Sequence, residues 1–452
     1  MYNITTMFRR TFHGGVFLSE RKEYTVDKKI KAIPAPRQII LPLSQHMGSP
    51  NECLVKPGDN VKLGQRIGET KARVSAPVHS PVSGRVKAIQ DFFNPIYGKA
   101  PAAVIENDGN DESIALVKRE NPETLSRQEL IRIIKDAGVV GLGGAAFPTH
   151  IKLNVPEGKR IDTLIINGAE CEPYLTSDHR LMVEKTNEIL NGIYLLAKIL
   201  EVSNVFLAIE DNKLSAIFAM EKAIREKTKK FPRSKRHTPI QIVVLKAKYP
   251  QGGENQLIKA ILKKEVPPAK FPPEVGVLVQ NVGTCFAICQ AVYEGKPLIE
   301  RCVTFTGRCL KEPGNFIVRL GTLLKDAVEF CGGFRDDLAK IIVGGPMMGI
   351  AQYSLDIPIV KDVTGVIFLS KKDLELFEES TCIRCARCVD VCPVNLLPTE
   401  IMRMVKYSRW HYLDKLYPGD CIECGACAYA CASKVPLVQY IKLAKLKEAE
   451  RK

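Results

Sequence analysis

Short alternating runs of apolar and polar residues, separated by turn clusters, dominate the first quarter of the chain. Two of these clusters, at 55–59 and 80–84, place proline, glycine, serine or aspartate between the runs. Alternation with a period of two is typical of strands that bury one face, and proline and glycine favour the turns between them. The pattern predicts a β domain over residues 1–115.

From about residue 120 the apolar runs alternate with helical patterns. Ser126 and Glu129 form a capping-box pattern, which predicts a helix through Ala137. Because strands that alternate with helices favour a largely parallel, covered sheet, we expect an α/β domain over residues 116–298. Its predicted strands are 163–166, 205–209, 240–245 and 275–279, and a helix is expected at 284–293.

Two smaller units follow. Residues 299–370 are interpreted as a small α+β domain. Residues 371–452 hold two groups of closely spaced cysteines, a predicted helix at 399–410 and a basic helical tail. The predicted fold class is therefore α/β with several domains, and the cysteine groups form the one clear internal repeat.

The cysteine groups have the C-x2-C-x2-C-x3-C spacing of ferredoxin-type ligands. In such runs three thiolates hold one cubane, and the fourth usually ligates the other one. Zinc sites, the alternative, typically use ligands in separated pairs. We predict two [4Fe–4S] clusters, the first held by Cys382, Cys385, Cys388 and Cys431, the second by Cys421, Cys424, Cys427 and Cys392.

A glycine-rich loop contains Gly141, Gly143 and Gly144 in a G-x-G-x-x-A pattern. The dinucleotide fingerprint requires a strand before this pattern and a helix directly after it. Here a helix is predicted before it and Phe147-Pro148 follow, so we reject a Rossmann loop. Backbone amides of such a loop can still converge on a phosphate, with Lys152 nearby to complement its charge. A purely structural glycine turn is the alternative.

Polar and acidic residues follow the predicted strand 163–166. Asn167, Glu170 and Glu172 come where open α/β sheets bind ligands, at the carboxyl end of a strand. Carboxylates suit the hydroxyls of a ribityl or ribose group better than they suit a phosphate. The alternative is a solvated turn.

Composition and charge narrow the class of protein. The chain has 452 residues, 45% of them hydrophobic and 25% charged, which excludes disordered and fibrous classes. No apolar run reaches the ~18 residues of a membrane span, and no signal peptide is recognised. The formal net charge of +15 suggests an acidic partner or an anionic membrane surface, with 221–236 and 442–452 as candidate contacts. Nucleic acid is disfavoured because no DNA- or RNA-binding motif is found.

Several segments resemble known families. "GVVGLGGAAFPTHIKL" (138–153), "NGAECEPYLTSDHRLM" (167–182), "YPQGGENQLI" (249–258) and "QNVGT" (280–284) resemble the flavin and NADH motifs of the complex I flavoprotein. The first domain resembles a lipoyl-like barrel sandwich, and the third resembles an SLBB (β-grasp-like) domain. With "HGGVFLSERK" (13–22) at the start and the two-cluster module at the end, the chain resembles the RnfC family, the C subunits of Rnf complexes.

The resemblance implies a Rossmann-like domain that binds FMN and uses NAD(H) as substrate. It implies a peripheral subunit on the cytoplasmic side of a membrane, in a complex whose other subunits bring electrons from ferredoxin and translocate Na+ or H+. None of the matched residues need act as acid, base or nucleophile. The residues that match the family's FMN and NAD(H) motifs are Gly141, Gly143, Gly144, Lys152, Asn167, Glu170, Glu172, Gly252, Glu254, Asn281 and Thr284.

Two alternatives remain open. A relative with the same modules can serve another electron acceptor. A non-catalytic iron–sulfur relay with a decayed flavin site is the second, because the chain departs from the flavoprotein motifs at four positions. Those motifs have arginines at the positions of Val140 and Leu142, an aspartate at Ala169 and a glycine at Tyr174.

Overall fold

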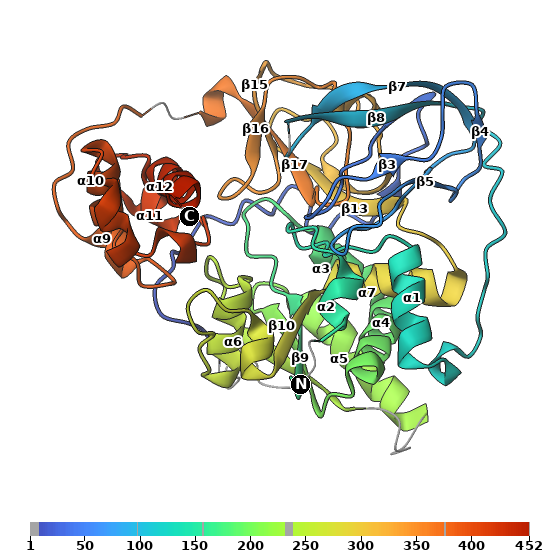
Figure 1. Cartoon of the computed structure of the whole chain (residues 1–452), viewed down its shortest axis with the longest axis horizontal. Helices are drawn as coiled ribbons and strands as arrows, with labels where there is room; N and C mark the ends of the chain where they lie inside the picture. The colour runs from blue at the N-terminus through green and yellow to red at the C-terminus, as the bar shows by residue number, and fades with distance from the viewer. Residues whose placement is uncertain (1–8, 97, 156–157, 231–237, 375–376, 452) are drawn as a thin grey trace.

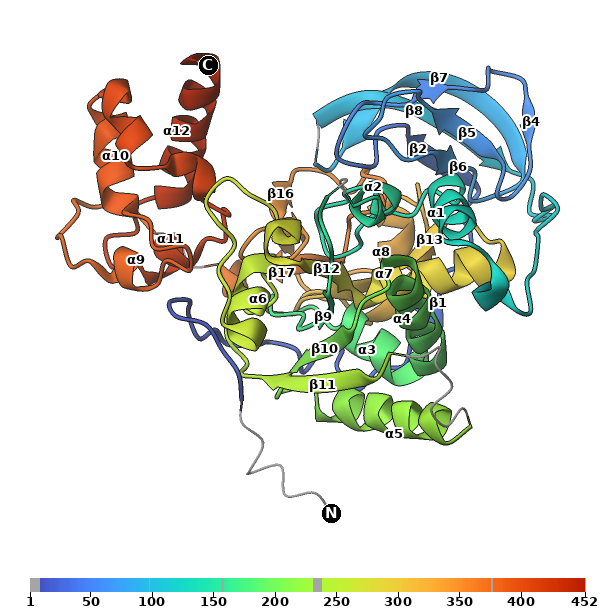
Figure 2. The same cartoon turned by 60° about the horizontal axis from the view of Figure 1, so that its bottom comes forward.

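The structure is a computed structural model that describes residues 9–96, 98–155, 158–230, 238–374 and 377–451. Figure 1 shows four parts, and the cysteine-rich module lies at the opposite end of the molecule from the N-terminal β domain. Figure 2 shows the same separation from a second direction. Among the described residues, no helix is both long and apolar enough to cross a membrane.

The N-terminal β domain consists of two small antiparallel sheets. Alternate side chains of both sheets, including Ile39, Leu41, Ile67, Val86 and Ile105, form one core. The first sheet has the order β2 (Gln38–Pro42), β8 (Gly98–Asn107), β7 (Gly84–Asn94), β4 (Asn60–Val61). The second has the order β3 (Glu52–Cys53), β5 (Arg66–Glu69), β6 (Val78–His79).

A parallel four-stranded sheet forms the centre of the second domain, as the alternating pattern predicted. Its order is β11 (Ile240–Leu245), β10 (Asn204–Glu210), β9 (Thr163–Gly168), β12 (Val277–Asn281). Helices cover both faces, with α6 (Glu254–Leu262) on one of them. The other face packs against α1 (Arg127–Asp136), α4 (Thr186–Leu200), α5 (Leu214–Lys230) and α7 (Val282–Cys289), and α2 (Thr149–Leu153) and α3 (Ser177–Glu184) complete the domain.

Most predicted boundaries agree with the structure to within about two residues. The capping box is present, because the Ser126 amide donates to Glu129 Oε2 at 2.7 Å and the Glu129 amide donates to Ser126 Oγ. The helix expected at 399–410 ends earlier, at Lys406, because Ser408 adopts a left-handed conformation (φ 54°) that stops the helix. A short 3-10 helix, Trp410–Lys415, follows it.

The third domain is a mixed six-stranded sheet to which the N-terminal segment adds an edge strand. Residues 10–33, which we grouped with the β domain by sequence, make their backbone pairings outside its two sheets, and the domain boundary stays a prediction. They run along the parallel sheet, where Val16 pairs with Tyr249, and end in β1 (Lys31–Ala32), which pairs with β14. The other strands are β14 (Gly314–Arg319), β13 (Glu300–Thr306), β17 (Gly365–Ser370), β15 (Leu338–Val343) and β16 (Ile350–Gln352), packed on α8 (Leu324–Phe330).

The C-terminal module contains two similar halves. Each half has a cysteine loop, a short helix and a longer helix, and its loop contains left-handed residues at matching positions. Arg384 matches Glu423 in this respect, and Ala386 matches Gly425. The helices are α9 (Arg387–Asp390) and α10 (Pro398–Lys406) in the first half, α11 (Ala426–Ala430) and α12 (Leu437–Arg451) in the second.

Of the two basic stretches proposed as contacts, the first is described only as far as Lys230, and its remaining residues lie outside the described residues. The second belongs to α12 as far as Arg451, and Lys452 lies outside the described residues.

Candidate flavin and iron–sulfur sites

A crevice is expected where β9 and β12 lie side by side. The strands that follow β9 in the chain, β10 and β11, extend the sheet on one side of it, whereas β12 lies on its other side, and ligands bind where the strand order reverses in this way. Asn167 and Asn281 are paired in register at the carboxyl ends of these two strands. The side-chain Nδ2 of Asn167 donates to the Gly252 carbonyl at 2.9 Å, which ties the third sequence motif to the second. The separate motifs therefore meet at one edge of the sheet.

The glycine-rich loop lies over the end of β12. The amide of Leu142 donates to Thr284 Oγ1 at 2.9 Å, and a Cβ on Gly143 would lie 3.4 Å from the Asn281 Cβ. Gly144 has a φ of +106°, a backbone conformation that other residues rarely adopt. Within the described part of the chain, the exposed amides of Gly143, Gly144 and Ala145 donate no hydrogen bond. Three consecutive free amides are a backbone arrangement that fits a phosphate.

This loop is held in position by three residues of neighbouring elements: Asn281, Thr284 and Arg301. Asn281 caps α7, because its Oδ1 accepts hydrogen bonds from the amides of Gly283 (2.8 Å) and Thr284 (3.3 Å). The buried guanidinium of Arg301, from β13, donates to the Leu142 carbonyl at 3.2 Å. Since Leu142 is bound through both its amide and its carbonyl, the free amides that follow it are held in a defined position.

The two acids of the second motif contact backbone amides rather than open solvent. Glu170 accepts from the amides of Asp178 (2.8 Å) and His179 (3.2 Å), and so stabilises the first turn of α3. Glu172 accepts from the amides of Met347 and Met348, each at 3.0 Å. Burial raises the pKa of Glu172 to about 7, although both amides oppose that shift. The contacts with ribityl or ribose hydroxyls that we expect for these acids stay predictions.

Lys152 and Glu254 meet at the rim of the crevice. Lys152 Nζ donates to Glu254 Oε1 at 2.6 Å, and both side chains are partly exposed. Lys152 comes from α2, just after the glycine-rich loop, and Glu254 opens α6 directly after Gly252 and Gly253. The ion pair therefore joins the first and third motifs and places the Lys152 ammonium at the rim.

Lys22 supports the acidic turn, a role that no sequence motif predicted. Its buried ammonium donates to the carbonyls of Glu170 (2.8 Å), Glu172 (3.0 Å) and Leu175 (2.6 Å). Burial lowers the pKa of Lys22 to about 8, with the charge of Lys213 adding to the effect. Lys22 lies in the family-like segment 13–22, so a signal existed, but only the tertiary structure shows which carbonyls it binds.

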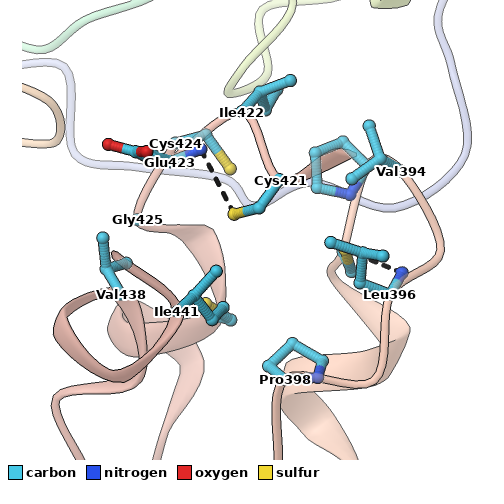
Figure 3. A pocket seen from close by; sticks show the side chains of 13 residues that line it. Val394, Leu396, Pro398, Cys421, Ile422, Glu423, Cys424, Gly425, Val438 and Ile441 are labelled. Atoms are coloured by element: carbon cyan, nitrogen blue, oxygen red, sulfur yellow. Dashed lines mark hydrogen bonds between the residues drawn. The ribbon is translucent and has the colours of Figure 1, made fainter. Parts of the chain in front are cut away.

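Four cysteines line one cavity of the C-terminal module, which we call the inner cage: Cys392, Cys421, Cys424 and Cys427. Figure 3 shows this cavity, with apolar walls that include Leu396, Val438 and Ile441. Two amides donate to its sulfurs, from Leu396 to Cys392 Sγ (3.2 Å) and from Glu423 to Cys421 Sγ (3.3 Å). Amide hydrogen bonds to cluster sulfurs are one way in which proteins set a reduction potential.

The remaining four ligands, Cys382, Cys385, Cys388 and Cys431, form what we call the outer cage. The chain around Cys431 returns to the first group, because Ser433 Oγ donates to the Thr381 carbonyl at 2.9 Å and the Ser380 amide donates to the Ser433 carbonyl at 3.0 Å. Burial raises the pKa of Cys388, and the Cys431 thiol adds to the shift. These contacts fit the crosswise grouping, and the ligand assignment of the outer cage stays a prediction.

The spacing of these thiols also bears on the zinc alternative. Within the described residues, no three His, Cys, Asp or Glu side chains converge closely enough for a single metal ion. A cubane spreads its thiolates over the corners of a cluster, so it needs a wider cage than one tetrahedral zinc ion. Because iron binds thiolates and burial raises the pKa of Cys424 to about 11, cluster insertion would release protons.

The inner cage lies directly against the second domain (residues 116–298), which we call the flavin domain. Tyr249, which is 2% exposed, donates its hydroxyl to the Cys424 carbonyl at 2.7 Å. Gln256 donates to the Pro393 carbonyl at 3.2 Å, and the Gly15 amide donates to the Val391 carbonyl at 2.8 Å. The same segment, 249–258, therefore contributes to the flavin crevice and to the contact with the inner cage.

Sequence models of four domain families match the chain in this order. The RnfC barrel sandwich hybrid domain matches residues 10–110, and the Nuo51 FMN-binding domain matches 134–290. The SLBB domain matches 302–351, and the 4Fe-4S dicluster domain matches 381–435. The matched ranges contain all the predicted cofactor and cluster ligands.

Curated relatives match over almost the whole chain. The C subunit of the proton-translocating ferredoxin:NAD(+) oxidoreductase complex of Clostridium ljungdahlii is 46% identical over 87% of this chain and 84% of its own length. The C subunit of the Na(+)-translocating complex of Acetobacterium woodii is 40% identical over 96% of both chains. Among solved structures, an NAD+-reducing [NiFe]-hydrogenase in the H2-reduced state has a TM-score of 0.51 at 17% identity, covering 71% of this chain and 62% of that one, which shows a likeness of fold.

Proposed function

The chain belongs to the family of C subunits of ion-translocating ferredoxin:NAD(+) oxidoreductase complexes, and we propose that its own residues bind FMN in the crevice between β9 and β12. It is a redox subunit that takes part in electron transfer between ferredoxin and NAD(H) through FMN and two [4Fe–4S] clusters. A flavin supplies the step that the clusters lack, because it exchanges hydride with a nicotinamide and single electrons with iron–sulfur centres.

The residues of the crevice divide into those that face a ligand and those that position the others. The free amides of Gly143, Gly144 and Ala145 would bind the FMN phosphate, with Lys152 as the nearby cation. Thr284, Asn281 and Arg301 hold the loop that carries these amides. No side chain is required to transfer a proton, so the chain's work is to bind, orient and exclude water.

The contact of the inner cage with segment 249–258 is the observation that carries the proposed order of electron transfer. The Tyr249 hydroxyl reaches the cage, while Gly252 and Glu254 of the same segment lie at the crevice. Electrons would therefore pass between the flavin and the inner cage, and between the inner and outer cages. We further propose a peripheral position on the cytoplasmic side of the membrane, with the other subunits of the complex as partners.

An anaerobic NADH titration of the purified chain tests this function. Flavin absorbance and the EPR signals of reduced clusters are followed together. We expect the flavin to bleach and at least one cluster signal to grow. Glu254→Gln is expected to weaken the response to NADH by roughly tenfold, since the Lys152 ammonium would lose its ionic partner at the rim. Glu265→Gln, which removes an exposed ion pair between Lys259 of α6 and the segment after that helix, is the control.

A non-catalytic relay is the second candidate. It is suggested by positions 140, 142 and 169, where buried Val140, Leu142 and Ala169 replace charged residues of the flavoprotein motifs. This candidate would be favoured if the chain held clusters but no flavin, and if NADH changed neither signal even after FMN was added.

A further inference from the structure

The two cysteine loops are equivalent by the internal repeat, yet they differ in burial. In the inner-cage loop, Cys424 is 7% exposed, Ala426 is fully buried, and the loop packs against Tyr249 and Met347. In the outer-cage loop, every residue from 383 to 387 is exposed, and Ile383 is 68% exposed. Both views draw α11 nearer to the rest of the molecule than α9 (Figures 1 and 2). One loop therefore faces the flavin domain and the other faces outward.

The outward loop also differs in charge. Arg384 and Arg387 occupy the positions of Glu423 and Ala426 in the inner loop. Within the described residues neither arginine forms an ion pair, and Asp390, the one acid of segment 381–392, pairs with neither of them. Other basic residues of the module are paired, such as Arg403 with Glu400 (2.9 Å), Lys406 with Glu379 (3.0 Å) and Lys445 with Glu423 (2.7 Å).

We propose that the loop 383–387 is the docking surface for an acidic protein domain that carries a surface-exposed iron–sulfur cluster. One electron would pass between that cluster and the outer cage, so one centre is oxidised as the other is reduced and no bond is formed. The proposal rests on the proposed function, since it needs a cluster in the outer cage. An exposed ligand, Cys385, brings that cage to the surface at the centre of the loop.

Charge and shape select this occupant. An exposed isoleucine, Ile383, followed by the unpaired Arg384 and Arg387 offers an apolar contact beside basic side chains, and such basic residues steer an acidic partner and fix its orientation. Anionic membrane surfaces are bound by larger clusters of basic residues than two arginines. The exposed lysines of α5, Lys222 and Lys229, are the competing basic surface, but α5 belongs to the flavin domain and not to the cluster module.

The test is stopped-flow reduction of the full holo chain by a small acidic ferredoxin with two [4Fe–4S] clusters, reduced beforehand with dithionite. For Arg384→Glu/Arg387→Glu we expect the second-order rate of cluster reduction at low ionic strength to fall by at least about tenfold. The difference in rate between this variant and the wild type should narrow as the salt concentration rises, because salt screens the charges that steer the partner. Lys222→Glu/Lys229→Glu makes the same change of charge on α5 and should keep the wild-type rate to within about twofold. Ile383→Ala, which keeps the charge, should lower the rate at every ionic strength.

Three readouts separate this proposal from its rivals. NADH must still bleach the flavin of Arg384→Glu/Arg387→Glu, the loop variant, and its cluster EPR must be that of the wild type. The proposed function fails separately, if NADH bleaches no flavin in the wild-type chain. A wild-type rate for the loop variant, or a loss confined to the α5 variant, overturns the proposal. So does a loss that persists at high salt together with a shifted midpoint potential, since the arginines would then tune the cluster. Loss of binding to anionic vesicles with an unchanged ferredoxin rate overturns it as well.

Discussion

Buried lysines hold backbone carbonyls where separate parts of the chain meet. Lys361 Nζ donates to the carbonyls of Pro77 and Gly138, each at 2.8 Å, and so joins the third domain to the β domain and the flavin domain. Burial alone lowers the pKa of Lys361 to about 7. A lysine without a carboxylate partner can stay in such a place because its neutral form avoids most of the cost of burying a charge.

Lys361 makes stability depend on pH in a defined window. Between about pH 7 and 10 the unfolded chain keeps the lysine proton and the native chain does not, so this residue makes stability rise with pH. For Lys361→Met we expect that contribution to disappear. The stability difference between wild type and variant, measured from the first urea transition, should grow by about 1.4 kcal/mol per pH unit. The exposed Lys340→Met should show a constant difference, and a constant difference for Lys361→Met would contradict the assignment.

At the scale of elements, the glycine-rich loop between α1 and α2 depends on its neighbours for its shape. Thr284 and Arg301 bind the two polar atoms of Leu142, and Gly144 adopts a φ of +106° in open space. A side chain at Gly144 would meet no atom within 4 Å, so a substitution there acts through backbone strain and not through a clash.

Gly144→Ala is therefore expected to weaken FMN binding more than it destabilises the fold. A strain of about 1–3 kcal/mol would move the amides that bind the phosphate, raising the FMN dissociation constant by about tenfold or more. Fluorescence quenching on titration of FMN into the deflavinated protein measures this change. Gly109→Ala is the matched control, because Gly109 also has a positive φ (+75°) and open space but follows β8, far from the loop in the chain. Equal FMN affinities for the two variants would argue against a phosphate site.

At the scale of the whole molecule, the cluster module is joined to the flavin domain through a few buried contacts. Glu172 of the flavin domain accepts hydrogen bonds from Met347 and Met348 in a loop of the third domain. The same loop also approaches Gly425 of the inner-cage loop, where an added Cβ would lie 2.9 Å from the Met347 carbonyl. Tyr249 contacts the same cage. The position of the inner cage relative to the flavin domain is thus set by contacts that involve three domains.

Tyr249→Phe removes the hydroxyl that donates to the Cys424 carbonyl and contacts the Glu172 side chain, without changing the apolar packing of this joint. We expect a loss of about 1–2 kcal/mol, because the buried Cys424 carbonyl would be left without its donor. The EPR signal of the inner-cage cluster should change while the outer-cage signal stays the same. Tyr429→Phe, at an exposed position of the module, should change neither stability nor EPR. If Tyr249→Phe matched that control, the hydroxyl would not be part of the joint.

Local features of the chain were predictable because their signals are local. The strands of the parallel sheet follow from short apolar runs, and Ser126 with Glu129 marks a helix start within one turn. The cluster ligands follow from spacing, since the geometry of a cubane restricts which nearby thiolates can share it. The pairing of β1 with β14, hundreds of residues later, was not predicted, because no local pattern in segment 10–33 reports such a pairing.

By itself the sequence determined which ligand set to expect, the glycine-rich loop and the order of the domains, since each depends on residues close together in the chain. Only the tertiary structure decided how these parts are used. Lys22, Arg301 and Tyr249 are single residues without a surrounding motif, and each acts on a carbonyl more than a hundred residues away. The two cysteine groups are nearly equivalent in spacing, so spacing cannot tell them apart. The packing of one loop against Tyr249 and Met347 makes one cage inner and leaves the other exposed.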